Sequence, residues 1–245
     1  MSEERRGLWL AWGLWFHFWL VLLTLYGGLT ALGLSLVDSS GRYLRILGCL
    51  WGKALLRLCR IDVRVEGREC LKPGETYVFA ANHRSQFDIF VLLAVLPGHF
   101  LWVAKKSLFR IPIFGQALAR AGSIPIDRSN RQEAIKSLNA AVDKVRAGFS
   151  IIIFPEGTRA VSRELLPFKK GVFVMALKAG KPVVPVAING TMAIQPRGAL
   201  RLKPGPVQVV ITPPLDPARF QTKEELMEAV RQAIAAHFNP DYPHQ

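Results

Sequence analysis

Residues 123–154 read SIPIDRSNRQEAIKSLNAAVDKVRAGFSIIIF, with a short apolar run at each end and an amphipathic pattern between them. Ser129 followed by Gln132 forms a capping box, and Gly148 is typical of a helix end, so the middle predicts a helix over about 130–147. One face of that helix is apolar, through Ala134, Ile135, Leu138, Ala141, Val142 and Val145. A strand, a helix and a second strand in succession indicate one unit of a parallel sheet.

The same alternation continues on both sides of this stretch, from residue 61 onward. We expect strands at Val63–Glu66, Tyr77–Ala81, Leu101–Ala104, Ser123–Ile126, Ser150–Phe154, Val183–Ile188 and Val207–Ile211. We expect further helices at about 86–96, 114–121, 171–179 and 223–238, the last opened by Thr222 with Glu225. The sequence therefore predicts an α/β domain over residues 61–245, with a largely parallel sheet flanked by helices.

An apolar segment precedes this domain, because residues 8–36 contain no Lys, Arg, Asp or Glu. As a helix it would extend about 43 Å at about 1.5 Å per residue, compared with a hydrocarbon core of about 30 Å. The segment predicts a membrane-associated helix. Its length leaves open whether the helix spans the bilayer or enters one leaflet.

Residues 42–60 predict a second, basic amphipathic helix. Its apolar residues recur at steps of three and four, and basic residues accompany them: Leu44, Leu47, Trp51, Ala54, Leu55 and Leu58, with Arg42, Arg45, Lys53, Arg57 and Arg60. Such a helix suits the headgroup region of an anionic membrane, and it equally suits docking on the following domain. We expect residues 1–60 to form a two-helix membrane anchor, with 42–60 on the cytoplasmic side.

The overall charge indicates an anionic partner. The chain of 245 residues carries 32 Lys plus Arg against 18 Asp plus Glu, a net charge of +14. A nucleic acid suits this chain less well than a membrane or a phosphate-bearing substrate, because the basic residues are spread along the chain. The three cysteines form no CxxC pair and are expected to be reduced and structural.

Three of the predicted strands end in runs of polar residues. These runs are Asn82–Asp88, Asp127–Arg128 and Pro155–Arg159. In an open α/β sheet, ligands bind beyond the carboxyl ends of the strands. If the three strands are parallel, the three runs lie at one site.

His83 and Asp88 are the candidates for proton transfer in the first run. Five residues apart, they would be separated by about 140° on one continuous helix, so they meet only if the helix starts after His83. Ser85 as N-cap permits that arrangement. His83 would then act as a general base, with Asp88 fixing its tautomer. The spacing is equally compatible with Asp88 as a mere helix cap and His83 as a loop histidine.

The second and third runs look like anion sites. Arg128 and Arg159 directly follow strands, and their planar guanidinium groups suit phosphate oxygens. Gly157, beside Glu156, permits a tight turn that aims backbone N–H groups at an anion. Lys105 adds a further cation. The other histidines have no acidic or Cys neighbours at ligand spacing, so we expect no metal site.

Together these motifs resemble the 1-acylglycerol-3-phosphate acyltransferases and their glycerolipid relatives. The resemblance covers residues 76–190 and lies in Asn82-His83-x4-Asp88, Gly122–Arg128, the complete Phe-Pro-Glu-Gly-Thr-Arg motif at 154–159, the Val184–Ile188 block, and Lys105 with 109–115. Pro125 stands where the family commonly has an aromatic residue. The order and spacing of the motifs make the resemblance specific.

The resemblance implies a reaction and a set of residues for it. His83 and Asp88 would be catalytic, and Lys105, Arg128, Glu156, Gly157, Thr158 and Arg159 would bind substrate. The acyl donor would be an acyl-CoA or acyl carrier protein thioester, the acceptor lysophosphatidic acid, and no cofactor would be needed. The enzyme would work on an anionic membrane, at the cytoplasmic face of a bacterial inner membrane.

Three other functions fit parts of the sequence. A related acyltransferase would use glycerol 3-phosphate or another lysophospholipid as acceptor. A lipid hydrolase would need a serine nucleophile, and the chain has no G-x-S-x-G elbow. A non-enzymatic membrane-binding protein would explain the anchor and the charge but not three polar runs at strand ends.

Overall fold

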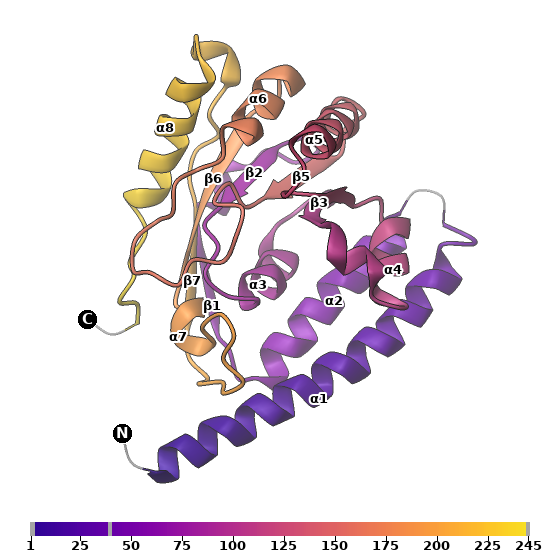
Figure 1. Cartoon of the computed structure of the whole chain (residues 1–245), viewed down its shortest axis with the longest axis vertical. Coiled ribbons are helices and arrows are strands. Elements are labelled where there is room, and N and C mark those ends of the chain that lie inside the picture. The colour runs from indigo at the N-terminus through magenta and orange to yellow at the C-terminus, as the bar shows by residue number, and fades with distance from the viewer. Residues whose placement is uncertain (1–2, 39–40, 244–245) are drawn as a thin grey trace.

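The computed structural model describes residues 3–38 and 41–243 of the chain. Its core is a seven-stranded sheet in the order β1-β7-β6-β2-β5-β3-β4 (Figure 1). The strands are β1 Val63–Glu66, β2 Val78–Ala81, β3 Phe100–Lys105, β4 Ile124–Ile126, β5 Ser150–Ile153, β6 Val183–Asn189 and β7 Val207–Ile211. Every neighbouring pair is parallel except β6 and β7, which run antiparallel. The predicted α/β class with a largely parallel sheet is confirmed.

Helices cover both faces of this sheet (Figure 1). Besides two N-terminal helices, they are α3 Phe87–Val95, α4 Phe114–Arg120, α5 Arg131–Arg146, α6 Lys170–Ala179, the short α7 Thr191–Ile194, and α8 Lys223–Ala235. Alternate residues of β2 point to opposite layers: Val78 and Ala80 pack with α5, α6 and α8, whereas Phe79 and Ala81 pack with α3. The central strands β2, β5 and β6 are therefore buried on both faces, as their continuous apolar sequences require.

Two helix starts test the predicted capping boxes. Thr222 caps α8 as predicted, because its hydroxyl accepts the N–H of Glu225 at 3.2 Å. The prediction of Ser129 as a cap was wrong. Asn130 caps α5 instead, accepting from the N–H groups of Gln132 and Glu133, while the Ser129 hydroxyl donates to Asp127. The predicted last helix also ends three residues early, at Ala235.

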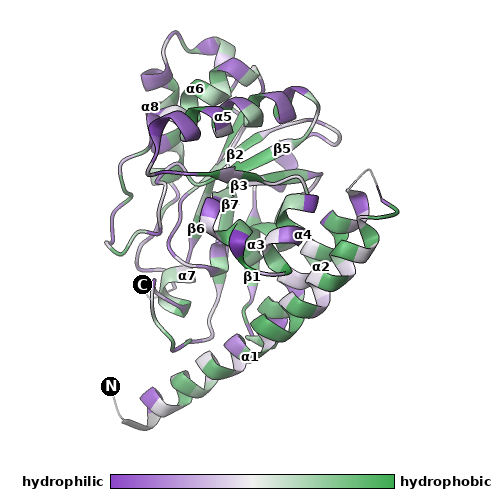
Figure 2. Cartoon of the chain, turned by 45° about the vertical axis from the view of Figure 1, so that its right-hand side comes forward, coloured by the Kyte–Doolittle hydropathy of each residue, from purple (hydrophilic) through white to green (hydrophobic). Residues whose placement is uncertain are grey.

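The N-terminal segments form two long helices, α1 Glu3–Leu34 and α2 Arg42–Leu58. Within the described residues, one helix, Arg5–Leu34, is long and apolar enough to cross a membrane. Most of its large apolar side chains are exposed, namely Leu8, Leu10, Leu14, Trp15, Phe18, Val21, Leu22, Leu25, Tyr26 and Leu29. Figure 2 shows hydrophobic residues along α1 and α2 and hydrophilic residues on α5.

Both helices also pack against the rest of the protein. Phe16 of α1 is fully buried, with its ring 4.8 Å from that of Phe87 and 6.0 Å from that of Phe90 in α3. On α2, Leu55 is fully buried and the Trp51 ring lies 5.0 Å from Phe90. Docking of the second helix on the following domain, one of its two predicted roles, is therefore confirmed. The predicted domain division at residue 60 stays a prediction.

The pair Phe16 and Phe18 provides a test of this seating. Phe16→Ala should lower the free energy of unfolding by about 3–5 kcal/mol, because it leaves a cavity among aromatic side chains. Phe18 is 59% exposed, so Phe18→Ala should change that energy by less than about 0.5 kcal/mol. Denaturant unfolding in detergent, followed by tryptophan fluorescence, measures both. Equal small changes would show that α1 does not pack on α3.

Candidate functional site

The three polar runs meet at one edge of the sheet. Strands β2, β5, β3 and β4 are neighbours and parallel, so their carboxyl ends point the same way. His83, Arg128, Thr158 and Arg159 all line a single cavity of about 460 Å³. The convergence predicted from the strand ends is therefore observed.

His83 is oriented by a buried carboxylate. Its Nδ1 lies 2.7 Å from Oδ2 of the fully buried Asp88. Because a carboxylate only accepts, Nδ1 donates, and Nε2 is left with a lone pair. The imidazole also stacks on Phe154, with ring centroids 3.8 Å apart. This is the arrangement of a general base held by an orienting group.

The same carboxylate oxygen also binds the backbone of the turn that carries His83. Asp88 Oδ2 accepts the backbone N–H groups of Arg84 at 2.7 Å and Ser85 at 2.9 Å. Helix α3 begins at Phe87, after His83, as the spacing required. One oxygen of Asp88 therefore contacts both the imidazole and the turn, so both contacts that the sequence left open are present. The prediction of Ser85 as N-cap was wrong, because Gln86 takes that position without a side-chain bond. The catalytic role of the pair stays a prediction.

Glu156 joins the third polar run to the first through hydrogen bonds. It is 2% exposed, and its two oxygens accept the N–H of His83 at 2.8 Å and of Leu166 at 3.0 Å. Burial raises the pKa of this carboxyl above its ordinary value. Neither Glu156 nor Gly157 lines the cavity. Their observed contacts shape the loop that follows β5.

Arg84 also binds the loop that follows β5. This side chain is only 2% exposed. Its guanidinium donates to the carbonyls of Ser162 and Glu164 and lies over the Phe238 ring. Burial lowers its pKa, while the negative charges of Glu156 and Asp88 oppose that shift. The sequence did not mark Arg84 as part of the site, because its role depends on segments far away along the chain.

Cations gather at the end of the cavity near His83. The predicted residues Lys105, Arg128 and Arg159 line it, and Arg128 also donates to the Gly157 carbonyl. Arg197 lines it as well, although no motif marks that position. Among the described residues, no Asp or Glu lines the cavity. An anionic ligand group would therefore be favoured here.

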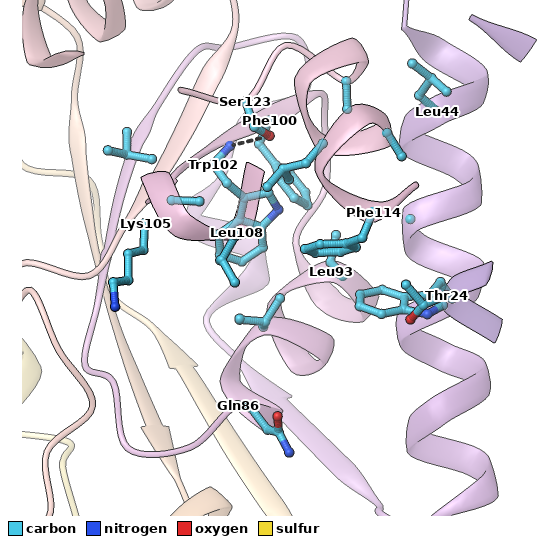
Figure 3. Close-up of a pocket in the computed structure, with 18 of the residues that line it drawn as sticks. Thr24, Leu44, Gln86, Leu93, Phe100, Trp102, Lys105, Leu108, Phe114 and Ser123 are labelled. Atoms are coloured by element: carbon cyan, nitrogen blue, oxygen red, sulfur yellow. Dashed lines mark hydrogen bonds between the residues drawn. The ribbon is translucent and has the colours of Figure 1, made fainter. Parts of the chain in front are cut away.

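The rest of the cavity lies between α1, α2, α3, α4 and β3 and is mostly apolar, although Arg45 and His99 also line it. Leu23, Leu44, Leu47, Trp51, Leu93, Trp102, Phe114 and Leu118 line this part. Figure 3 shows Thr24 and Leu44 on one side of the cavity and Lys105 on the opposite side. A single ligand could place a charged group among the cations and a hydrocarbon chain among these side chains. The sequence did not reveal this part, because α1 and α2 supply much of its wall.

Comparisons with known proteins agree with this arrangement. The protein family described as Acyltransferase matches residues 62–189. A 1-acyl-sn-glycerol-3-phosphate acyltransferase of Chlamydomonas reinhardtii is 37% identical over 181 residues, 73% of this chain and 54% of that protein. The Limnanthes alba enzyme of the same name is 37% identical, over 71% of this chain and 63% of that protein. The Salmonella typhimurium enzyme of the same name is also 37% identical, over 69% of this chain and 68% of that protein. The matches thus span little more than half to two thirds of these relatives.

A solved structure is similar over nearly the whole chain. It is the crystal structure of the 1-acyl-sn-glycerophosphate (LPA) acyltransferase PlsC from Thermotoga maritima. The TM-score is 0.85 at 29% sequence identity, and 95% of each chain is covered. The match therefore includes the two N-terminal helices as well as the sheet.

The role of Glu156 as a support for the site can be tested through stability. Glu156→Gln keeps the shape but turns one acceptor oxygen into an NH2 group facing a backbone N–H. The free energy of unfolding should fall by about 1–3 kcal/mol, since a buried donor loses its partner. Glu164→Gln, at an exposed position of the same loop, is the matched control and should leave the denaturant midpoint unchanged. Equal midpoints for the two variants would contradict the support role.

Proposed function

This chain belongs to the acyltransferase family, and we propose that it makes phosphatidic acid for phospholipid biosynthesis. It would transfer a fatty acyl group from acyl-CoA or acyl carrier protein to the sn-2 hydroxyl of 1-acylglycerol 3-phosphate. One observation carries the proposal: His83, oriented by Asp88, lines a cavity that has Lys105, Arg128, Arg159 and Arg197 in one part and a mostly apolar lining in the other. Those two parts match the phosphate and the hydrocarbon of the substrates.

His83 would act as the base. Its Nε2 takes the proton of the acceptor hydroxyl while the hydroxyl oxygen attacks the thioester carbonyl, and the Asp88 carboxylate stabilises the imidazolium that forms. When the carbon–sulfur bond breaks, the imidazolium returns the proton to the leaving thiolate. Donor and acceptor react directly, so the site's contribution beyond proton transfer is to position them.

Lys105 and Arg159 would hold the acceptor phosphate. Both line the cavity near His83, and Thr158 adds a hydroxyl beside them. Arg128 lines the same cavity and would bind the phosphate as well. It also donates to the Gly157 carbonyl, so it would shape the loop together with Glu156. A phosphate monoester carries about −1.5 to −2 charges at pH 7, which several cations neutralise better than one.

The exposed apolar side of α1 supports membrane association, and its seating supports insertion into one leaflet. A Cβ on Gly13 would meet the Leu200 carbonyl oxygen, and one on Gly28 would meet the Ile113 side chain, so α1 touches the protein near both ends. A helix held lengthwise along the protein cannot stand upright in a bilayer by itself. We place the site at the cytoplasmic face of a bacterial inner membrane, where lysophosphatidic acid enters from the leaflet.

The decisive experiment is acyl transfer by the purified protein, read as thiol release. The panel contains lysophosphatidic acid, glycerol 3-phosphate and lysophosphatidylcholine as acceptors, with acyl-CoA and acyl carrier protein as donors. We expect transfer to lysophosphatidic acid above all others. Preference for glycerol 3-phosphate would move the chain to the other acyltransferase subclass, and donor hydrolysis without acceptor would contradict transfer.

The proton-transfer role predicts a specific loss. His83→Ala should reduce kcat by at least about 100-fold, the lower range for a general base, while the unfolding midpoint changes little. Asp88→Asn should be similarly inactive and also less stable by about 1 kcal/mol, because the oxygen it alters caps the turn. His237→Ala, at an exposed position away from the cavity, is the control. Near-normal turnover by a folded His83→Ala protein would contradict the assignment of His83 as the general base.

The phosphate site predicts a different kinetic pattern. Arg159→Ala and Lys105→Ala should each raise the acceptor KM by about 10-fold or more, because each removes a charge-assisted contact of about 1.5–3 kcal/mol. Arg159→Lys should recover little, since an ammonium cannot reproduce a two-pronged guanidinium contact. Lys106 is the neighbouring control, as it pairs with Asp127 and does not line the cavity. If Lys106→Ala and Lys105→Ala give the same acceptor KM, the phosphate lies elsewhere.

A further inference from the structure

The loop at residues 195–203, between α7 and β7, touches the turn that carries His83. The Ser85 hydroxyl donates to the Gln195 carbonyl at 2.7 Å, and the Gln86 amide donates to the Gln195 side chain. Gln195 is 2% exposed, and its own amide donates to the Ala199 carbonyl at 3.0 Å. One end of the loop is therefore fixed to the turn that carries His83.

The other end of the same loop lies against α1. The Leu202 N–H donates to the Trp9 carbonyl at 2.9 Å, and Leu202 is fully buried. At Gly13, a Cβ would lie 2.0 Å from the Leu200 carbonyl oxygen, so only glycine permits this close approach. The loop is thus held between the apolar N-terminal helix and the turn that carries His83.

Arg197 extends from the middle of this loop to the cavity. Its guanidinium donates to the Thr158 hydroxyl at 3.2 Å and to the Arg159 carbonyl at 3.4 Å. Both acceptors are neutral, and no acidic residue of the described chain lines the cavity beside it. A guanidinium has five N–H groups, and both contacts come from a single nitrogen, so donors remain for a ligand. Arg128, in comparison, already donates to the Gly157 carbonyl.

We propose that Arg197 is a further cation of the acceptor site, binding the phosphate together with Lys105 and Arg159, and that α1 sets its position through the 195–203 loop. The inference rests on the proposed function for the identity of the acceptor. It adds a residue outside every sequence motif of the site. It also gives α1 a part in substrate binding in addition to membrane association.

Kinetics of Arg197→Ala test the first half of the proposal. The acceptor KM for lysophosphatidic acid should rise about tenfold, with the donor KM unchanged and Arg197→Lys intermediate. Transfer to 1-acylglycerol, which lacks the phosphate, should be unaffected, so the preference for the phosphorylated acceptor should shrink by the same factor. Arg201→Ala, at an exposed position of the same loop that does not line the cavity, is the control. An unchanged acceptor KM, or equal losses on both acceptors, would overturn the inference.

A binding measurement separates this inference from the proposed function. Calorimetry with sn-glycerol 3-phosphate as the probe needs no turnover. If the wild-type protein transfers no acyl group to any lysolipid, the proposed function fails. If Arg197→Ala binds the probe more weakly than Arg201→Ala does, the role of Arg197 in binding phosphate is still supported. Equal probe binding by the two variants would overturn that role.

Gly13→Ala tests the second half. The added methyl should push the loop from its seat and raise the acceptor KM in the direction of Arg197→Ala. Because Gly13→Ala should act only through the position of Arg197, the double variant should be no worse than Arg197→Ala alone. Gly7→Ala, on the same helix with open space around it, should leave the acceptor KM unchanged. Two results would show that α1 does not set the position of Arg197. One is an additive rise of the acceptor KM in the double variant, and the other is a Gly13→Ala protein with unchanged thermal unfolding and unchanged acceptor KM.

Discussion

One buried carboxylate oxygen, Oδ2 of Asp88, determines the geometry on which the rest of the site depends. It accepts from the His83 imidazole and from the backbone N–H groups of Arg84 and Ser85. These three donors offset the desolvation free energy of the buried carboxylate, which would be uncompensated if the group had no partner. The direction of the imidazole and the start of α3 therefore cannot change independently. The five-residue spacing between His83 and Asp88 follows from this turn, since a continuous helix would place them on different faces.

The second constraint is the parallel pairing of β2 with β5. Phe79 lies beside Ile152 and Ala80 beside Ile153, so the two strands end level with each other. Phe154 and Glu156 then reach the first polar run, one stacking on the His83 ring and the other accepting its backbone N–H. Two buried carboxylates in this small volume are tolerated because the buried Arg84 guanidinium lies near both. Buried charges persist when they are paired and hydrogen-bonded.

The sequence predicted what depends on local pattern and on strand direction. The α/β class, the helix over residues 131–146 and the meeting of His83 with Arg128 and Arg159 all follow from periodicity and strand ends. The cap of α5 was misplaced by one residue, because Asp127 captures the Ser129 hydroxyl and Asn130 takes over the cap. No local signal shows that β7 reverses direction against β6. Arg197 and the apolar wall from α1 and α2 were missed for a related reason, since only the folded chain brings those segments to the cavity.

An acyl transfer between amphiphiles sets a requirement that this arrangement meets. The reacting oxygen and carbonyl must be held by polar groups, while the attached hydrocarbon chains gain nothing from leaving the membrane for water. Here α1 exposes apolar side chains on its outer side, while Leu23 and Thr24 of the same helix line the cavity that contains His83. Its N-terminal half supports the loop that carries Arg197. A helix needed only for anchoring would require none of these inner contacts. The contacts of α1 thus connect the position of the protein at a membrane with the shape of the site where the proposed reaction occurs.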